Sequence, residues 1–168
     1  VNMTYVVMDN HVYGLTKGQA SPRSDIGFVT KTTPRGAFES PLSVCETAIA
    51  AGATFVAQGY MINRAQLVEL IQKAMDHEGF SFINVFSPCV TYNKHNSYDW
   101  FKEHLVELPE GYDPTDRAAA LKTLGETDGL VTGVIYQDTT KPSFEKALAA
   151  ANGGPHPRPL TEDVVKPD

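Results

Sequence analysis

Three short, almost wholly apolar runs constrain the fold of this 168-residue chain more than any other feature. They span residues 4–7, 54–60 and 80–86 and are rich in Val, Phe and Tyr. A helical pattern over residues 64–77, with Asn63 as a candidate N-cap, separates the second run from the third. Continuously apolar strands are typical of a parallel sheet whose faces are covered, so we predict an α/β fold with helices on both faces of a parallel sheet.

Turn and capping residues predict the remaining elements. Pro41 at a first helical position, with Ser40 as its N-cap, predicts a helix that ends at Gly52, and Cys45 falls on its apolar face as a small core residue. Further helices are expected over 98–105 after Ser97, over 114–124 after Asp113 and over 142–151, with a strand over 130–136. Residues 1–151 then form one domain, and residues 152–168 form an irregular, proline-rich tail.

The loop after the first apolar run, residues 9–22, is dense in small and polar side chains. Ligands of open α/β sheets bind outside the carboxyl ends of the strands, which is where this loop begins. Its amide, hydroxyl and ammonium groups suit a diphosphate held through a divalent cation, and Gly14 and Gly18 leave backbone N–H groups accessible. The spacing alone is equally compatible with an anion-binding loop and with a structural turn.

The residue types in this loop are more specific than their spacing. The stretch Asp-Asn-His-Val-Tyr-Gly-Leu-Thr-Lys-Gly-Gln-Ala-Ser-Pro, residues 9–22, resembles the thiamine diphosphate loop in the beta subunits of 2-oxoacid:ferredoxin oxidoreductases. The resemblance implies a parallel-sheet thiamine diphosphate-binding fold, with the Asn10 side chain and the Val12 carbonyl as Mg²⁺ ligands. It also implies that Gly14 and Thr16 lie against the cofactor's diphosphate.

The same resemblance implies that Leu15 lies near the thiazolium ring and that Lys17 faces the substrate as a catalytic residue. A Lys in a pocket attracts the carboxylate of a 2-oxoacid. Tyr-Gly-Leu-Thr-Lys-Gly-Gln is more similar to the 2-oxoglutarate and broad 2-oxoacid enzymes than to the pyruvate-specific ones. Arg23 stands where the family usually has a small hydroxylated residue. The resemblance therefore does not determine which residue forms the far wall of the substrate pocket. Residues 23–36 are predicted to form an extended loop. Its Arg and Lys side chains could reach the substrate or a partner subunit, but exposure on the solvated surface is the preferred interpretation.

Cys89 follows the third apolar run directly. A lone Cys at such a position is by itself a buried or half-buried thiol. However, Ser-Pro-Cys-Val-Thr-Tyr-Asn, residues 87–93, resembles the segment of the same family that supplies the last cysteine of a [4Fe-4S] cluster. The resemblance implies that Cys89 is a cluster ligand and that the other three cysteines lie outside this sequence. No histidine is assigned to a site, His11 inside the loop included.

The chain begins at Val1, just before the first strand, and contains neither the Gly-Asp-Gly start of the cofactor motif nor a Cys-x-x-Cys pair. The resemblance therefore implies the C-terminal part of a longer polypeptide, with the N-terminal part of the fold missing. We expect the 168 residues alone to be inactive as a catalyst.

The function implied is that of a beta subunit paired with a separate alpha subunit. It would carry out the coenzyme A-dependent oxidative decarboxylation of 2-oxoglutarate and pass electrons through the cluster to ferredoxin. Three alternatives stay open: a pyruvate:ferredoxin oxidoreductase beta subunit, a non-oxidative thiamine enzyme without a cluster, and a structural or assembly module.

Composition excludes other classes. The net charge of −6 and the lack of a Lys/Arg cluster argue against a nucleic-acid-binding protein. No apolar stretch has the length of a membrane span. Cys45 and Cys89 are far apart and form no disulfide framework, which favours a reducing, cytoplasmic setting.

Overall fold

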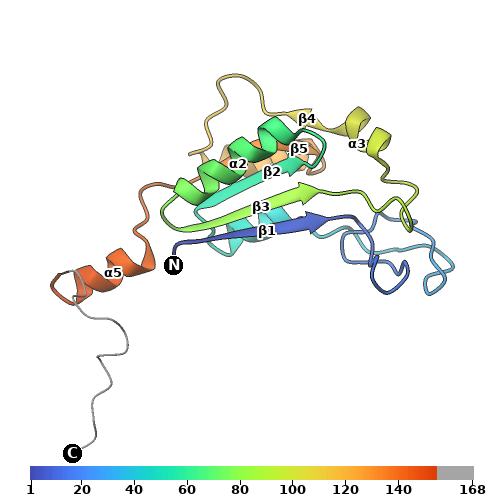
Figure 1. The fold of residues 1–168 in the computed structure, drawn as a ribbon, viewed down its shortest axis with the longest axis horizontal. Helices are drawn as coiled ribbons and strands as arrows, with labels where there is room; N and C mark the ends of the chain where they lie inside the picture. Colours follow the sequence, from blue (N-terminus) through green and yellow to red (C-terminus); the bar gives the residue numbers. More distant parts are fainter. Residues whose placement is uncertain (155–168) are drawn as a thin grey trace, which may run out of the picture.

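The fold is built on a five-stranded sheet with the strand order β1-β3-β2-β5-β4 (Figure 1). It is seen in a computed structural model, which describes residues 1–154. The strands are β1 (Met3–Asp9), β2 (Phe55–Tyr60), β3 (Phe80–Phe86), β4 (Val106–Glu107) and β5 (Val131–Gln137).

The three strands predicted from apolar runs form the parallel part of the sheet. Asp9 at the end of β1 and Tyr60 at the end of β2 both lie opposite Phe86 at the end of β3. The three strands therefore finish at one edge, and Figure 1 shows their arrowheads pointing toward the same group of loops. This register places the segments that follow β1 and β3 side by side.

The last two strands depart from the predicted parallel arrangement. β5 pairs with β2 in the antiparallel direction, and β4 pairs with β5 in parallel. After β3 the chain passes through α3 (Tyr98–His104) and enters β4 from the carboxyl-end side, so β4 and β5 run back across the sheet (Figure 1). β4 itself was not predicted, because two residues are too short to show an alternating pattern.

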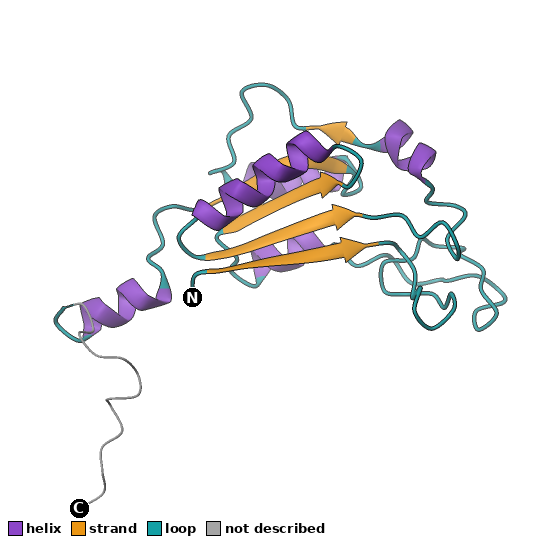
Figure 2. Cartoon of the chain, viewed as in Figure 1, coloured by secondary structure: helices purple, strands orange, loops and turns teal. Residues whose placement is uncertain are grey.

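Helices cover both faces of the sheet, as predicted (Figure 2). On one face, α1 (Val44–Ala50) and α4 (Arg117–Glu126) pack with the strands in an apolar cluster that includes Cys45. On the other face, α2 (Arg64–Asp76) contributes Leu70 and Ala74 to a second cluster. None of the helices described is both long and apolar enough to cross a membrane.

α1 begins later than the sequence predicts. It starts at Val44 after Ser43 instead of at Pro41, because the Leu42 N–H donates to the Pro22 carbonyl at 2.8 Å and keeps this segment out of the helix. The predictions that Asn63 caps α2 and Ser97 caps α3 are confirmed.

α4 also begins later, at Arg117 instead of at Pro114. The Asp113 carboxylate accepts from the Thr115 N–H at 2.9 Å, which closes a local turn ahead of the helix. The carboxylate of Asp116 then accepts from the first backbone N–H groups of α4 and acts as its N-cap.

β1 is not the buried strand that its composition predicts. It lies at the edge of the sheet and pairs only with β3 among the described strands. Tyr5 is 53% exposed and Met8 is 70% exposed. The apolar residues of β1 are therefore suited to burial but are uncovered in the residues described.

α5 (Phe144–Ala151) stands apart from the rest of the molecule, beyond the amino ends of β1 and β3 (Figure 1). None of its side chains is buried, and Lys146 pairs with Glu78 at 2.5 Å. Ser143 caps it, so it begins two residues after the predicted Pro142. Residues 155–168 of the predicted irregular tail lie outside the described part of the chain.

Candidate functional site

The segments that follow β1 and β3 meet at the carboxyl-end edge of the sheet (Figure 1). We call residues 10–20 the cofactor loop and residues 87–96 the cysteine turn. All of the site residues predicted from the sequence lie in these two segments.

The tip of the cofactor loop is held closed by its own backbone. The Tyr13 N–H donates to the Gln19 carbonyl at 3.0 Å, and the Gly18 N–H donates to the Tyr13 carbonyl at 2.9 Å. Lys17 has a φ of 75°, a left-handed conformation that reverses the chain. Leu15 is 98% exposed, and Thr16 and Lys17 are exposed beside it. Of the residues predicted to meet the thiazolium ring, diphosphate and substrate, Leu15, Thr16 and Lys17 are thus presented outward, and Gly14 is half-buried.

The base of the cofactor loop offers oxygen atoms to a hard cation. The Asn10 Oδ1 accepts the Val12 N–H at 3.1 Å, which orients the amide, and an amide oxygen has a second lone pair to give. Val12 is buried, so its backbone position is fixed by the core. An amide oxygen and a backbone carbonyl are donors that Mg²⁺ accepts alongside phosphate and water. The residues present therefore fit the predicted cation.

Gly14 brings the cofactor loop against Cys89. A Cβ atom on Gly14 would lie 3.4 Å from the Cys89 Sγ and 3.7 Å from the Asn10 Nδ2. The space that such a side chain would fill is bounded by the predicted cation ligand on one side and the predicted cluster ligand on the other. Cys89 is half-buried and forms no disulfide with Cys45, the other cysteine of the described residues. The structure thus brings together predicted residues that are 75 positions apart in the sequence.

An ion pair that the sequence analysis missed anchors the start of the loop. The Arg23 Nε lies 2.7 Å from the Asp9 Oδ2, and the Asp9 side chain is only 3% exposed. Arg23 also donates to the Leu42 carbonyl at 2.5 Å and contacts the His11 ring at 3.2 Å. The prediction that Arg23 is solvated surface is therefore wrong, because its side chain is only 20% exposed and its guanidinium bonds segments on either side of it. Neither residue carries a sequence signal of this pairing.

His11 is a buried residue near the start of the cofactor loop, with a φ of 57°. Its ring lies edge-on to Phe101 at 5.5 Å, and its Nδ1 lies 3.6 Å from the Asp25 Oδ1. Burial raises the pKa of Asp25, but the nearby His11 ring and the hydrogen bond that the Asn96 amide donates at 2.8 Å outweigh it, so this pKa lies below its ordinary value. His11 thus supports the loop from the core side.

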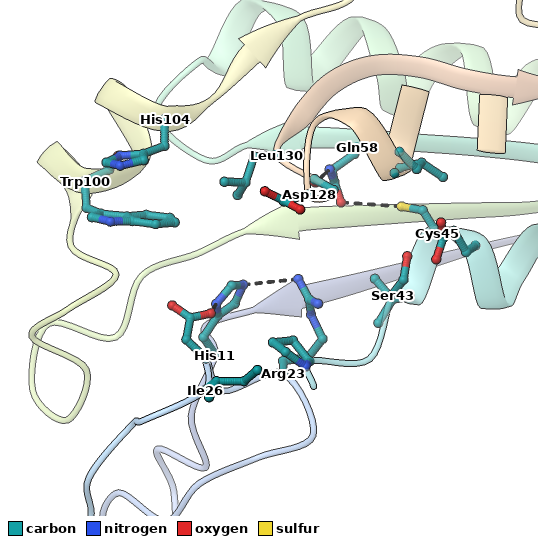
Figure 3. A pocket seen from close by; sticks show the side chains of 17 residues that line it. His11, Arg23, Ile26, Ser43, Cys45, Gln58, Trp100, His104, Asp128 and Leu130 are labelled. Atoms are coloured by element: carbon teal, nitrogen blue, oxygen red, sulfur yellow. Dashed lines mark hydrogen bonds and ion pairs between the residues drawn. The ribbon is translucent and has the colours of Figure 1, made fainter. Parts of the chain in front are cut away.

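A cavity of about 600 Å³ lies next to this anchor (Figure 3). Its lining includes His11 and Arg23 on one side and Trp100 and His104 on another, and the last two rings stack at 4.3 Å. None of the residues predicted to hold the cofactor or the cluster lines this cavity. The predicted site is therefore the open surface formed by the cofactor loop and the cysteine turn.

Comparison with known families agrees with this geometry. Residues 1–85 match the family described as thiamine pyrophosphate enzyme, C-terminal TPP binding domain, thiamine pyrophosphate being another name for thiamine diphosphate. Residues 89–152 match the family that describes the C terminal of the pyruvate ferredoxin oxidoreductase beta subunit. The chain therefore belongs to the thiamine diphosphate-dependent enzymes, and the cofactor loop lies in the domain that gives this class its name.

Comparison with individual proteins shows to which family within this class of enzymes the chain is similar. The chain is 33% identical to a 2-oxoacid:ferredoxin oxidoreductase subunit beta of Saccharolobus solfataricus, over 99% of this chain and 58% of the relative. It is 31% identical to the 2-oxoglutarate synthase subunit KorB of Methanocaldococcus jannaschii, over 88% of this chain and 55% of the relative. Within its class, the chain is a member of the beta-subunit family of 2-oxoacid:ferredoxin oxidoreductases.

A solved structure has the same fold. It is described as 2-oxoglutarate:ferredoxin oxidoreductase from Magnetococcus marinus with 2-oxoglutarate, coenzyme A and succinyl-CoA bound. The two superpose with a TM-score of 0.86 at 38% identity, over 99% of this chain and 59% of that one. The present chain thus spans somewhat more than half the length of the relatives it matches.

Proposed function

We propose that this chain is part of the beta subunit of a 2-oxoglutarate:ferredoxin oxidoreductase. Such an enzyme converts a 2-oxoacid and coenzyme A to an acyl-coenzyme A, releases carbon dioxide and passes electrons to ferredoxin. The observation that carries the proposal is the close approach of the Cys89 thiol to Gly14, 3.4 Å from where a Cβ on Gly14 would lie, since it brings the cofactor loop next to a cysteine suited to hold an iron–sulfur cluster. The complete enzyme would also contain an alpha subunit and would work in the cytoplasm.

Residues of the cofactor loop would hold the cofactor at the carboxyl-end edge of the sheet. The Asn10 Oδ1 and the Val12 carbonyl would bind Mg²⁺, and the backbone of Gly14 and the hydroxyl of Thr16 would lie against the diphosphate. When bound, thiamine diphosphate supplies the carbanion that adds to the 2-oxo carbon and the electron sink for decarboxylation. Leu15 would exclude water from the apolar side of the ring.

Lys17 would set the substrate class. Its ammonium group is exposed at the loop tip and would attract a carboxylate of the substrate. A dicarboxylic 2-oxoacid offers this cation a second carboxylate, which pyruvate lacks. The names of several relatives refer to 2-oxoglutarate, and the Magnetococcus marinus structure holds it together with coenzyme A. Pyruvate is the second candidate, because one of the matching families is described by that substrate.

The test is turnover of the purified full enzyme with each 2-oxoacid, coenzyme A and ferredoxin. We expect Lys17→Met to lower kcat/KM for 2-oxoglutarate by about tenfold to a hundredfold, the range that corresponds to loss of one charge-assisted contact. Lys31→Met, which removes an exposed lysine from the next loop, is the matched control and should change little. Turnover of pyruvate but not of 2-oxoglutarate would overturn the substrate assignment. An iron-free enzyme that releases carbon dioxide without reducing ferredoxin would favour a non-oxidative thiamine enzyme.

A further inference from the structure

The cofactor loop and the cysteine turn touch in a way that joins two sites of the proposed function. Besides the approach of Gly14 to Cys89, Gly18 packs on the Tyr92 ring, because a Cβ at Gly18 would lie 3.0 Å from the ring's Cδ1. Gly18 has a φ of 98°, so glycine is suited to this position by both its conformation and its size. The two segments therefore pack as one unit.

Asn93 lies at the centre of this unit and is 1% exposed. Its Nδ2 donates to the Asn10 carbonyl at 3.3 Å and to the Asn96 Oδ1 at 2.8 Å. Its own backbone N–H donates to the Cys89 carbonyl at 2.9 Å. Its Oδ1 accepts the backbone N–H groups of His95 and Asn96, so every polar group of the side chain has a partner.

We propose that Asn93 is a positioning residue that fixes the predicted cation ligand Asn10 and the predicted cluster ligand Cys89 at one separation. This role rests on the proposed function. One N–H of the Asn93 amide reaches the cofactor loop at Asn10, while its other N–H, its Oδ1 and its backbone N–H all bond within the cysteine turn that carries Cys89. A side chain with only acceptor atoms cannot do this, since the Asn10 carbonyl needs a donor. Loss of Asn93 should therefore loosen both sites together.

The sharpest variant is Asn93→Asp, which keeps the shape and the acceptor oxygen and removes the donors to Asn10 and Asn96. Asn93→Ser has a shorter side chain, so it loses the donor to the Asn10 carbonyl without adding a buried charge. This second variant tests the positioning role if Asn93→Asp does not fold. Asn84→Ala is the matched control, because Asn84 is also a fully buried amide, but it bonds Gln58 at 2.9 Å and reaches Asp9 only at 3.5 Å, with no bond to the cofactor loop or the cysteine turn.

Two measurements other than turnover report on the cofactor site and on the Cys89 site in the full enzyme. The first is the dissociation constant of Mg²⁺–thiamine diphosphate, measured by titration calorimetry. The second is the rate of alkylation of Cys89 at pH 8 after iron has been removed with a chelator, followed by mass spectrometry of the peptide that contains it. Burial raises the pKa of the Cys45 thiol to about 12, so Cys45 stays protonated and serves as an internal reference.

We expect both Asn93 variants to weaken cofactor binding by about tenfold or more, as loss of groups that orient metal ligands generally does. The same variants should speed Cys89 alkylation, while Asn84→Ala lowers the denaturation midpoint and changes neither readout. If cofactor binding changes without the alkylation rate, or the reverse, Asn93 does not couple the two sites and the proposal fails. If the wild-type enzyme binds no thiamine diphosphate, the proposed function fails instead, and the alkylation arm alone decides whether Asn93 holds the cysteine turn.

Discussion

Arg23 shows how much a single side chain can do when it meets three segments at once. Its guanidinium joins the end of β1, the core side of the cofactor loop and the residues that lead into α1. A planar group with several fixed donors suits such a junction, and a lysine would satisfy fewer of these acceptors. The charge of Arg23 is directed at the Asp9 carboxylate.

Removing Arg23 should therefore destabilise the fold more than removing an ordinary arginine does. We expect Arg23→Ala to lower the free energy of unfolding by about 2 kcal/mol, since it leaves the buried Asp9 carboxylate unpaired while Arg23 itself is partly solvated. Arg35→Ala, in the same long loop but exposed, should stay within about 0.5 kcal/mol. Equal denaturation curves for the two variants would mean that the Asp9–Arg23 pair contributes nothing to stability.

Helix boundaries show which part of the fold the sequence could predict. α2 was predicted almost to its ends because Asn63 has no rival cap nearby and the apolar spacing is sustained for 13 residues. α1 and α4 each offer two candidate caps three residues apart, and local rules cannot choose between them. Contacts with distant segments, such as Leu42 with Pro22, make the choice. The same holds for the candidate site: motifs predicted the cofactor loop and Cys89 as its parts, whereas the pairings of Asp9 and Asn93 depend on the sheet register.

The caps themselves should differ in strength. The Asp116 carboxylate accepts from the N–H groups of Ala118 and Ala119, whereas Ser43 makes no side-chain bond at the start of α1. Asp116→Ala should therefore cost about 1 kcal/mol of stability and Ser43→Ala close to nothing. Chemical denaturation of the two variants side by side checks this, and a larger loss for Ser43→Ala would contradict the assigned cap geometry.

The exposed edge of β1 should make the 168-residue chain self-associate through strand pairing. It lacks the devices that commonly protect edge strands, such as lysine, proline or a bulge along its length. We expect Met8→Lys to reduce concentration-dependent association with a stability change within about 0.5 kcal/mol. Met75→Lys on α2 is the matched control, because Met75 is 71% exposed and Met8 is 70% exposed. Sedimentation velocity over a range of concentrations measures the effect, and an equal response to both variants would point to general surface apolarity instead of the strand edge.

Taken as a whole, the molecule has two chemically different ends. The carboxyl ends of the parallel strands carry the candidate site, and the amino end carries His77, which lies beside Phe55 and bonds the Thr54 hydroxyl at 2.8 Å. Burial lowers the pKa of His77 below its ordinary value of 6.5, in spite of the opposing charges of Asp138 and Glu78. The folded state thus resists protonation at this end.

The lowered pKa of His77 makes the free energy of unfolding depend on pH, and this free energy should decrease as the pH falls. Below pH 6.5 the unfolded chain binds a proton at His77 more readily than the folded chain, so stability present above that pH is lost as the pH falls. We expect Tm to fall between pH 7.5 and 5.5, roughly one unit on either side of the ordinary histidine pKa, and the fall to be smaller in His77→Gln. Asp25 does not contribute in this window, because its lowered pKa places its own loss of stability below pH 3.8. An unchanged slope in His77→Gln would assign the pH dependence to another group.

Because α5 stands apart from the sheet, it is a suitable place to attach the chain to a surface. It projects from the end of the molecule opposite the cofactor loop and buries none of its side chains, so a chemical anchor there disturbs no packing (Figure 1). A chain with a selectively reactive non-natural residue in place of Ala150, which is exposed on this helix, could be immobilised there and would present Asn10, Lys17 and Cys89 to the flowing solution in a single orientation. Binding of cofactor, substrate or a partner protein could then be followed on one uniformly oriented layer of molecules.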